Sequence, residues 1–179
     1  MDLKSAFLKL LESKHKNPAL IILYTFIDIC ASLANESKKK NREIFQSYLE
    51  RYLVRRKPPF SNFDLWAARS SIVHSYSPIG NHTGKEKNAK PIFYYSWPEK
   101  KEDVETEIIR RGYSDFILLD IEEIKWVAID CFNNFYRRIE DNAHFEDLVL
   151  NNAEHILSDL NSYRYENELL LIDELNNMT

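Results

Sequence analysis

The sequence predicts a mainly helical bundle that carries a small β-hairpin insertion. Apolar side chains recur at intervals of three or four residues over most of the chain, as they do in amphipathic helices. Only 3 of the 179 residues are glycine, which leaves little material for tight hairpins or glycine-rich phosphate loops. The 6 prolines fall mainly between the periodic segments, where they begin or end helices.

Three helices are expected in the first third of the chain. Residues 2–13 place Phe7 and several leucines on one face. Pro18 opens a second helix, whose stretch 20–33 is apolar nearly all round and is therefore expected at the centre of the core. Residues 41–54 form an amphipathic helix, which the pair of prolines after it ends.

A fourth helix is expected to run from Ser61 towards Tyr76. Ser61, followed three residues later by Asp64, is a capping signal at its start, and the Ser-Pro pair after Tyr76 ends it. The polar and basic stretch 81–90 is then expected to be a loop.

Two short strands interrupt the helical pattern. Residues 92–97 and 116–120 are rich in aromatic and branched side chains and are bounded by proline and glycine. We expect them to pair as one hairpin, with residues 99–111 between them. The loop and the hairpin, about residues 80–120, would then form an insertion in the bundle.

Helices are expected again after the insertion. Residues 121–139 carry an apolar inner face, and a further helix follows Asn142. The C-terminal part, residues 143–179, is expected to be helical and to end in a short helix near 169–175. No internal repeat is found, so residues 1–179 are expected to form a single domain.

The composition is typical of a globular protein in a reducing compartment. Hydrophobic residues make up 44% of the chain and charged residues 29%. The longest apolar run, 20–34, is interrupted by Asp28 and other polar residues, so no membrane span is expected, and the N-terminus lacks the pattern of a signal peptide. Cys30 and Cys131 lie in apolar helical patterns and are interpreted as core residues. These features favour a cytoplasmic protein.

The net charge of −4 is unevenly distributed along the chain. Residues 140–179 hold ten acidic side chains against one basic one, whereas the rest of the chain has a net charge of +5. Basic clusters occur at 38–42, 51–57, 85–90 and 100–101. Such clusters are usually solvated faces, and a surface that binds phosphate is the alternative interpretation.

The fourth helix carries an arginine inside its apolar stripe. Because an unpaired buried charge is costly, Arg69 must pair with an acid, lie at an interface or face a ligand. Asp28, the lone charged residue of the central apolar helix, is the candidate partner. His74 is rotated from Arg69 by roughly 140° in a straight helix, so the two face one point only if the helix ends near His74 or a second molecule completes the site. Tyr76 lies two turns from Arg69 on nearly the same face.

Residues 64–76 have the sequence Asp-Leu-Trp-Ala-Ala-Arg-Ser-Ser-Ile-Val-His-Ser-Tyr. This stretch resembles the signature helix of the HEPN superfamily, whose motif is R-x4-6-H. The narrower form R-x4-H-x-Y is similar to that of HEPN toxins paired with nucleotidyltransferase antitoxins. Residues 19–136 as a whole resemble small bacterial HEPN-like proteins, and the resemblance is carried by the stretches 23–28, 64–78 and 90–97.

The resemblance implies an HEPN-like helical bundle that cleaves RNA at a homodimer interface, without metal or cofactor, in a toxin or defence setting. Attack of a ribose 2′-OH on the neighbouring phosphodiester would leave a 2′,3′-cyclic phosphate and a 5′-OH. His74 would act as general acid and base, and Arg69 would clamp the phosphate. Ser70 would hydrogen-bond the scissile region, and Tyr76 would orient the substrate or be modified. The implied partners are a second copy of the chain, RNA, and an antitoxin or nucleotidyltransferase.

Two other functions fit the same residues. A non-catalytic HEPN-like module would use the same groove to bind RNA, a nucleotide or a protein. Ser70 favours this alternative, because HEPN ribonucleases often carry Asn at that place. A structural or immunity-type partner would use Arg69 only in a pair with Asp28.

The motif residues also have ordinary structural interpretations. Tyr76 could pack in the core or at an interface, and His74 could be a simple helix-end residue. Arg138 and His144 fit the related spacing R-x5-H. They lie across an expected helix end and no tyrosine follows, so this second match is interpreted as coincidence.

Overall fold

A computed structural model of the chain confirms a mainly helical fold with a small sheet. Among the described residues there are seven helices and two strands. The structure describes residues 3–13, 15–36, 40–53, 58–75, 77–80, 82–83, 88–96 and 98–156.

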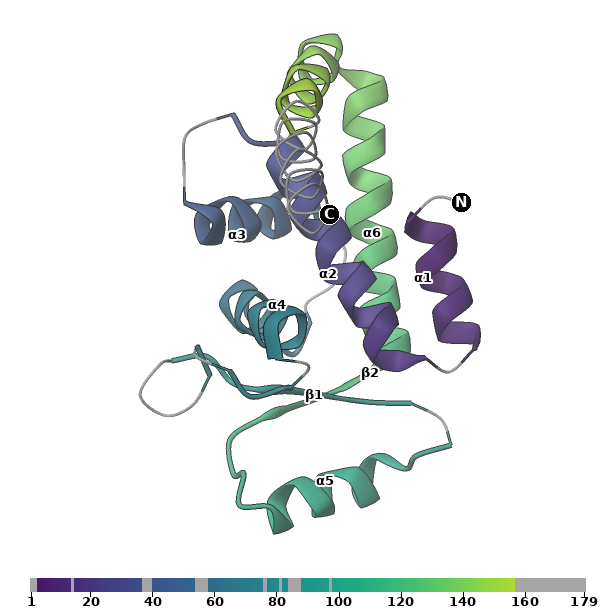
Figure 1. Cartoon of the computed structure of the whole chain (residues 1–179), viewed down its shortest axis with the longest axis vertical. Helices are drawn as coiled ribbons and strands as arrows, with labels where there is room; N and C mark the ends of the chain where they lie inside the picture. The colour runs from purple at the N-terminus through teal and green to yellow at the C-terminus, as the bar shows by residue number, and fades with distance from the viewer. Residues whose placement is uncertain are drawn as a thin grey trace, which may run out of the picture.

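Helix α2 (Lys16–Leu33) lies at the centre of the bundle (Figure 1). It contacts α1 (Leu3–Glu12), α3 (Asn41–Tyr52), α4 (Asn62–Ser75) and α6 (Ile121–Asp141). The apolar character of α2 on nearly all sides is explained by these contacts, because each neighbour covers a different face. Its buried residues are Ala19, Leu20, Leu23, Tyr24, Ile27, Cys30 and Ala31.

By length and composition alone, α2 is also apolar enough to cross a membrane, and among the described helices no other one is. The contacts of α2 are nevertheless those of a core helix. Four helices pack on it, and its one acidic side chain, Asp28, is paired with Arg69 of α4. Cys30 of α2 and Cys131 of α6 are both buried, as predicted for core cysteines.

Helix α4 begins with the predicted cap. The backbone N–H of Asp64 donates to the Ser61 hydroxyl (3.1 Å), and the backbone N–H of Ser61 donates to Oδ2 of Asp64 (2.8 Å). The second carboxylate oxygen of Asp64 accepts from the backbone N–H of Lys90 (2.7 Å). Asp64 therefore fixes the start of α4 and also holds the segment that leads into the sheet.

The sheet differs from the predicted hairpin. Strands β1 (Ile92–Tyr95) and β2 (Ile117–Asp120) pair in parallel, with Ile92 opposite Ile117. Helix α5 (Lys101–Arg110) connects them and lies beyond the sheet at one end of the molecule (Figure 1). The hairpin prediction was wrong because it treated residues 99–111 as a simple connection between antiparallel strands. A helix in this segment returns the chain to the end of the sheet where β1 begins, so the second strand runs parallel to the first.

The sheet is attached to the bundle through α2, α4 and α6. The hydroxyl groups of Tyr24 in α2 and Tyr94 in β1 hydrogen-bond to each other. Helix α6 begins directly after β2, and the Asp120 carboxylate caps it by accepting from the backbone N–H of Glu122 (2.9 Å). The insertion is thus fixed to the end of the bundle near the start of α6.

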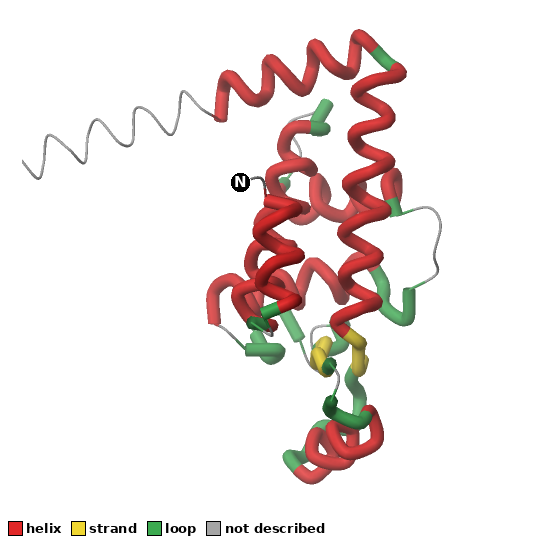
Figure 2. The backbone as a smooth tube through the Cα atoms, turned by 90° about the vertical axis from the view of Figure 1, so that its right-hand side faces the viewer, coloured by secondary structure: helices red, strands yellow, loops and turns green. Residues whose placement is uncertain are grey.

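A last described helix covers residues 143–156 at the opposite end of the bundle (Figures 1 and 2). Asn142 caps it by accepting from the backbone N–H of Phe145 (2.9 Å). Asn152 donates to the carbonyl groups of Leu33 (2.9 Å) and Asn35 (3.1 Å), which fixes the C-terminal end of α2. The short helix expected near 169–175 lies outside the described residues.

Candidate functional site

The motif residues of helix α4 are less buried than the side chains that face the core. Its core-facing side chains include Leu65, Ala68 and Ile72, all of which are buried. Arg69 and Ser70 are half-buried, and His74 is exposed in the last turn. Packing of the apolar side against the bundle therefore sets the direction in which the motif residues point.

Arg69 forms an ion pair with Asp28 of the central helix. The guanidinium Nε donates to Oδ2 of Asp28 at 2.6 Å. The side chains keep 25% and 28% of their surface exposed, respectively. The predicted pair is thus confirmed, but it lies at the edge of the core, where another anion can still reach the guanidinium.

The electrostatic setting of Asp28 links both motif residues to one carboxylate. Burial raises the pKa of Asp28. The charge of Arg69 and its hydrogen bond oppose that shift, and the charge of His74 opposes it as well, but burial outweighs them. Arg69 therefore acts on Asp28 by direct contact, and His74 acts on it through its charge.

A small cavity of about 90 Å³ opens beside the ion pair. It lies between α2, α3 and α4, and its polar lining comes from Asp28, Ser32, Asn41 and Arg69. The rest of the lining is Ala31, Ile44 and Phe45. The cavity gives a small polar group, such as a phosphate oxygen, access to the guanidinium of Arg69.

Neither of the two other predicted site residues on this motif, Ser70 and Tyr76, is among the described residues that line the Arg69 cavity. Ser70 is half-buried and follows Arg69 on α4. Consecutive residues of a helix point in different directions, so Ser70 lies on a different part of the helix surface from the ion pair. Tyr76 lies outside the described residues. Arg138 of α6, which with His144 fits the spacing R-x5-H, pairs with Glu36 and hydrogen-bonds to Tyr52.

A row of aromatic rings beside the motif was not foreseen. Phe63 and Trp66 of α4 are stacked, with ring centroids 5.8 Å apart, and Trp66 contacts the His82 ring at 4.4 Å. The Arg42 guanidinium of α3 lies 5.8 Å from the Phe63 ring. The signal in the sequence was the three-residue spacing of Phe63 and Trp66 on one helix face. Trp66 is half-buried against the core.

Among the residues that the structure describes, no group of three or more His, Cys, Asp or Glu side chains is placed to hold a metal ion. The guanidinium of Arg69 and the carboxylate of Asp28 line the cavity, and the imidazole of His74 lies in the exposed last turn of α4.

Comparison with known proteins adds no relative. No family model, no curated protein and no solved structure matches the chain.

Proposed function

We propose that this protein is a metal-independent endoribonuclease of the HEPN type that acts as a cytoplasmic homodimer. One observation carries the proposal: Arg69, the arginine of the motif, pairs with Asp28 at the edge of the core and lines a cavity beside this pair, and His74 follows it in the exposed last turn of the same helix. A cation that binds phosphate and an imidazole that moves protons are the two groups that cleavage of RNA by its own 2′-OH requires.

The reaction proceeds by transfer of the phosphodiester within the RNA strand. His74 removes the proton of the ribose 2′-OH, and the 2′-oxygen forms a bond to phosphorus while the bond from phosphorus to the 5′-oxygen breaks. The leaving 5′-oxygen takes a proton from the His74 imidazole of the second copy. Arg69 donates to the phosphate oxygens as charge gathers on them. The products are a 2′,3′-cyclic phosphate and a 5′-OH.

Asp28 has a positioning role in this scheme. It accepts from Nε of the Arg69 guanidinium at 2.6 Å, and an incoming phosphate would compete with it for this guanidinium. Ser70, next to Arg69, supplies a hydroxyl to the scissile region. Tyr76 orients the substrate or is modified by a nucleotidyltransferase partner, a role that rests on the resemblance of the R-x4-H-x-Y signature to that of HEPN toxins.

A second candidate function is a non-catalytic module of the same type that binds RNA, a nucleotide or a protein. The observation that favours it is the short Arg69–Asp28 pair, because a guanidinium that stays with its carboxylate does not move onto the charge of a transition state, whereas its remaining N–H groups can still bind a ligand. This candidate predicts binding of RNA without cleavage.

The test is incubation of a mixed-sequence RNA with the purified chain in EDTA, with analysis of the product ends and light scattering for the mass of the protein. The proposal predicts a dimer that leaves 2′,3′-cyclic phosphate and 5′-OH ends. The same RNA with 2′-O-methyl riboses should stay intact, because it has no hydroxyl group to attack the phosphate. Binding of both RNAs by a folded dimer that cleaves neither would establish the non-catalytic module instead.

A further inference from the structure

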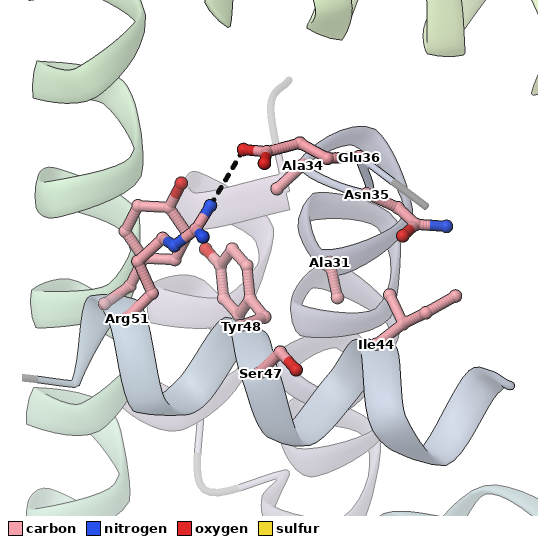
Figure 3. A pocket seen from close by; sticks show the side chains of 9 residues that line it. Ala31, Ala34, Asn35, Glu36, Ile44, Ser47, Tyr48 and Arg51 are labelled. Carbon is pink, nitrogen blue, oxygen red and sulfur yellow. Dashed lines mark hydrogen bonds and ion pairs between the residues drawn. The ribbon is translucent and has the colours of Figure 1, made fainter. Parts of the chain in front are cut away.

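A larger cavity lies on the same side of α2 as the Arg69 cavity, nearer to the C-terminal end of the helix. Its volume is about 390 Å³, and it lies between the end of α2 and helix α3 (Figure 3). Ala31 and Ile44 line both cavities, so the two are neighbours along one groove between α2 and α3. The remaining residues that line the larger cavity are Ala34, Asn35, Glu36, Ser47, Tyr48, Arg51 and Tyr52.

Two arginines from different helices meet at Glu36, which lines this cavity together with Arg51. Nη1 of Arg51, from α3, and Nη2 of Arg138, from α6, each donate to the same oxygen, Oε1 of Glu36, at 3.0 Å. Figure 3 shows Arg51 reaching from α3 towards the Glu36 carboxylate. Glu36 therefore fills the position between two guanidinium groups that the oxygen of a bound anion would otherwise take.

The two arginines differ in how firmly they are held. Arg138 donates to the Tyr52 hydroxyl at 2.9 Å and lies 3.9 Å from the centre of the Phe145 ring, so its guanidinium is fixed in place. The side chains of Arg51 and Glu36 are 49% and 52% exposed. Glu36 is exposed in its pairs with both arginines, and exposed ion pairs contribute little to stability, so a ligand displaces this carboxylate at little cost.

We propose that Arg51 and Arg138 form a second phosphate-binding site, which Glu36 occupies until a ligand arrives. The ligand class is a phosphate group, and the RNA strand that enters the Arg69 cavity is its expected source; this choice of source rests on the proposed function. Asn41, at the first cavity, and Arg51, at the second, are ten residues apart in α3, about 15 Å along the helix axis. A single strand that follows the groove places one phosphate near Arg69 and a later one between Arg51 and Arg138.

The experiment measures binding of a fluorescent 2′-O-methyl oligonucleotide, which the chain cannot cleave by attack of a 2′-OH. We expect Arg51→Gln to weaken binding about tenfold and to reduce the dependence on salt by about one counterion. Glu36→Gln should tighten binding several-fold, because it removes the competing carboxylate. Arg110→Gln is the matched control, because this exposed arginine of α5 pairs with Glu107 on a different part of the molecule, and it should leave binding unchanged.

Two results would overturn the proposal: Arg51→Gln indistinguishable from the Arg110→Gln control, or Glu36→Gln binding more weakly than the wild type. Competition with inorganic phosphate and with a mononucleotide separates the two sources of the phosphate group. If the mononucleotide competes at concentrations far below those needed for inorganic phosphate, and Arg51→Gln abolishes this competition, the site exists and its ligand is a free nucleotide. Weak competition by both small anions supports the RNA strand as the ligand.

The binding experiment on the second site can fail or succeed independently of the cleavage test for the proposed function. A chain that cleaves RNA but shows no effect of Arg51→Gln loses only the second site. A chain that does not cleave RNA but shows the Arg51 and Glu36 effects keeps the second site and loses the ribonuclease.

Discussion

The molecule contains two arginine–carboxylate pairs along one groove, and they behave in opposite ways. The Arg69–Asp28 pair keeps about a quarter of each side chain exposed, and burial raises the pKa of Asp28. The Arg51–Glu36 pair is about half exposed, and hydrogen bonds from Arg138 and Arg51 lower the pKa of Glu36. The same pair of functional groups thus gives opposite shifts, because desolvation dominates at one position and hydrogen bonding at the other.

The difference indicates different uses. Asp28 lies on the central helix, and loss of Arg69 would leave its partly buried carboxylate without a partner. Glu36 follows the end of α2 and holds an arginine that water already reaches. We therefore assign the chemistry to the first pair and a replaceable binding contact to the second.

Cleavage of RNA should separate the two arginines most sharply. We expect Arg69→Ala and His74→Ala each to reduce the single-turnover cleavage rate by about 100-fold or more, because each removes a group that the proposed reaction requires. Arg51→Gln should instead raise the RNA concentration needed for half-maximal rate and leave the maximal rate nearly unchanged. His144→Ala, at the exposed histidine of the coincidental spacing, is the control. Equal loss from Arg69→Ala and Arg51→Gln would contradict the assignment.

Stability should separate the two carboxylates next. Asp28→Ala leaves the partly buried Arg69 without its partner and should lower the free energy of unfolding by about 2 kcal/mol. Glu36→Ala removes an exposed acceptor and should cost less than about 1 kcal/mol. Urea unfolding followed by circular dichroism measures both. A larger loss for Glu36→Ala than for Asp28→Ala would show that the exposed pair is the structural one.

The smallest expected effect is on the pH dependence of stability. Because the pKa of Asp28 is raised, the folded chain holds that proton more tightly than the unfolded chain, so its contribution to stability falls as pH rises from the unfolded pKa through the folded one. The lowered pKa of Glu36 gives the reverse, a contribution present above the unfolded pKa and lost as pH falls through the folded one. The free energy of unfolding of the wild type, relative to that of Asp28→Asn, should therefore fall as pH rises. Relative to that of Glu36→Gln, it should rise with pH. If both stability differences change with pH in the same direction, the opposite pKa shifts of Asp28 and Glu36 are contradicted.

Local signals predicted much of the bundle and the first ion pair. Ser61 and Asp64 marked the start of α4, and the continuous apolar character of residues 20–33 marked the central helix. The Arg69–Asp28 pair could be predicted because each charge stood alone in an apolar helical pattern, and a lone charge in a core requires a partner.

The missed features depend on contacts between distant parts of the chain. Helix α5 has one buried residue, Ile108, so it adds little to the core, and two four-residue strands carry no signal for their relative direction. The second arginine site joins Glu36 to Arg138, which are 102 residues apart in the sequence, and no local pattern connects them.

The central claim is that two copies of α4 form one RNA-cleaving site, and mixing wild type with His74→Ala tests it most directly. After subunit exchange at equal amounts, with heterodimers verified by differently tagged chains, the claim predicts that only dimers with two wild-type copies are active. About a quarter of the activity then remains, from the random pairing of two kinds of subunit in a two-fold dimer. Retention of about half, in proportion to the wild-type subunits, would show that each copy works alone and would contradict the claim.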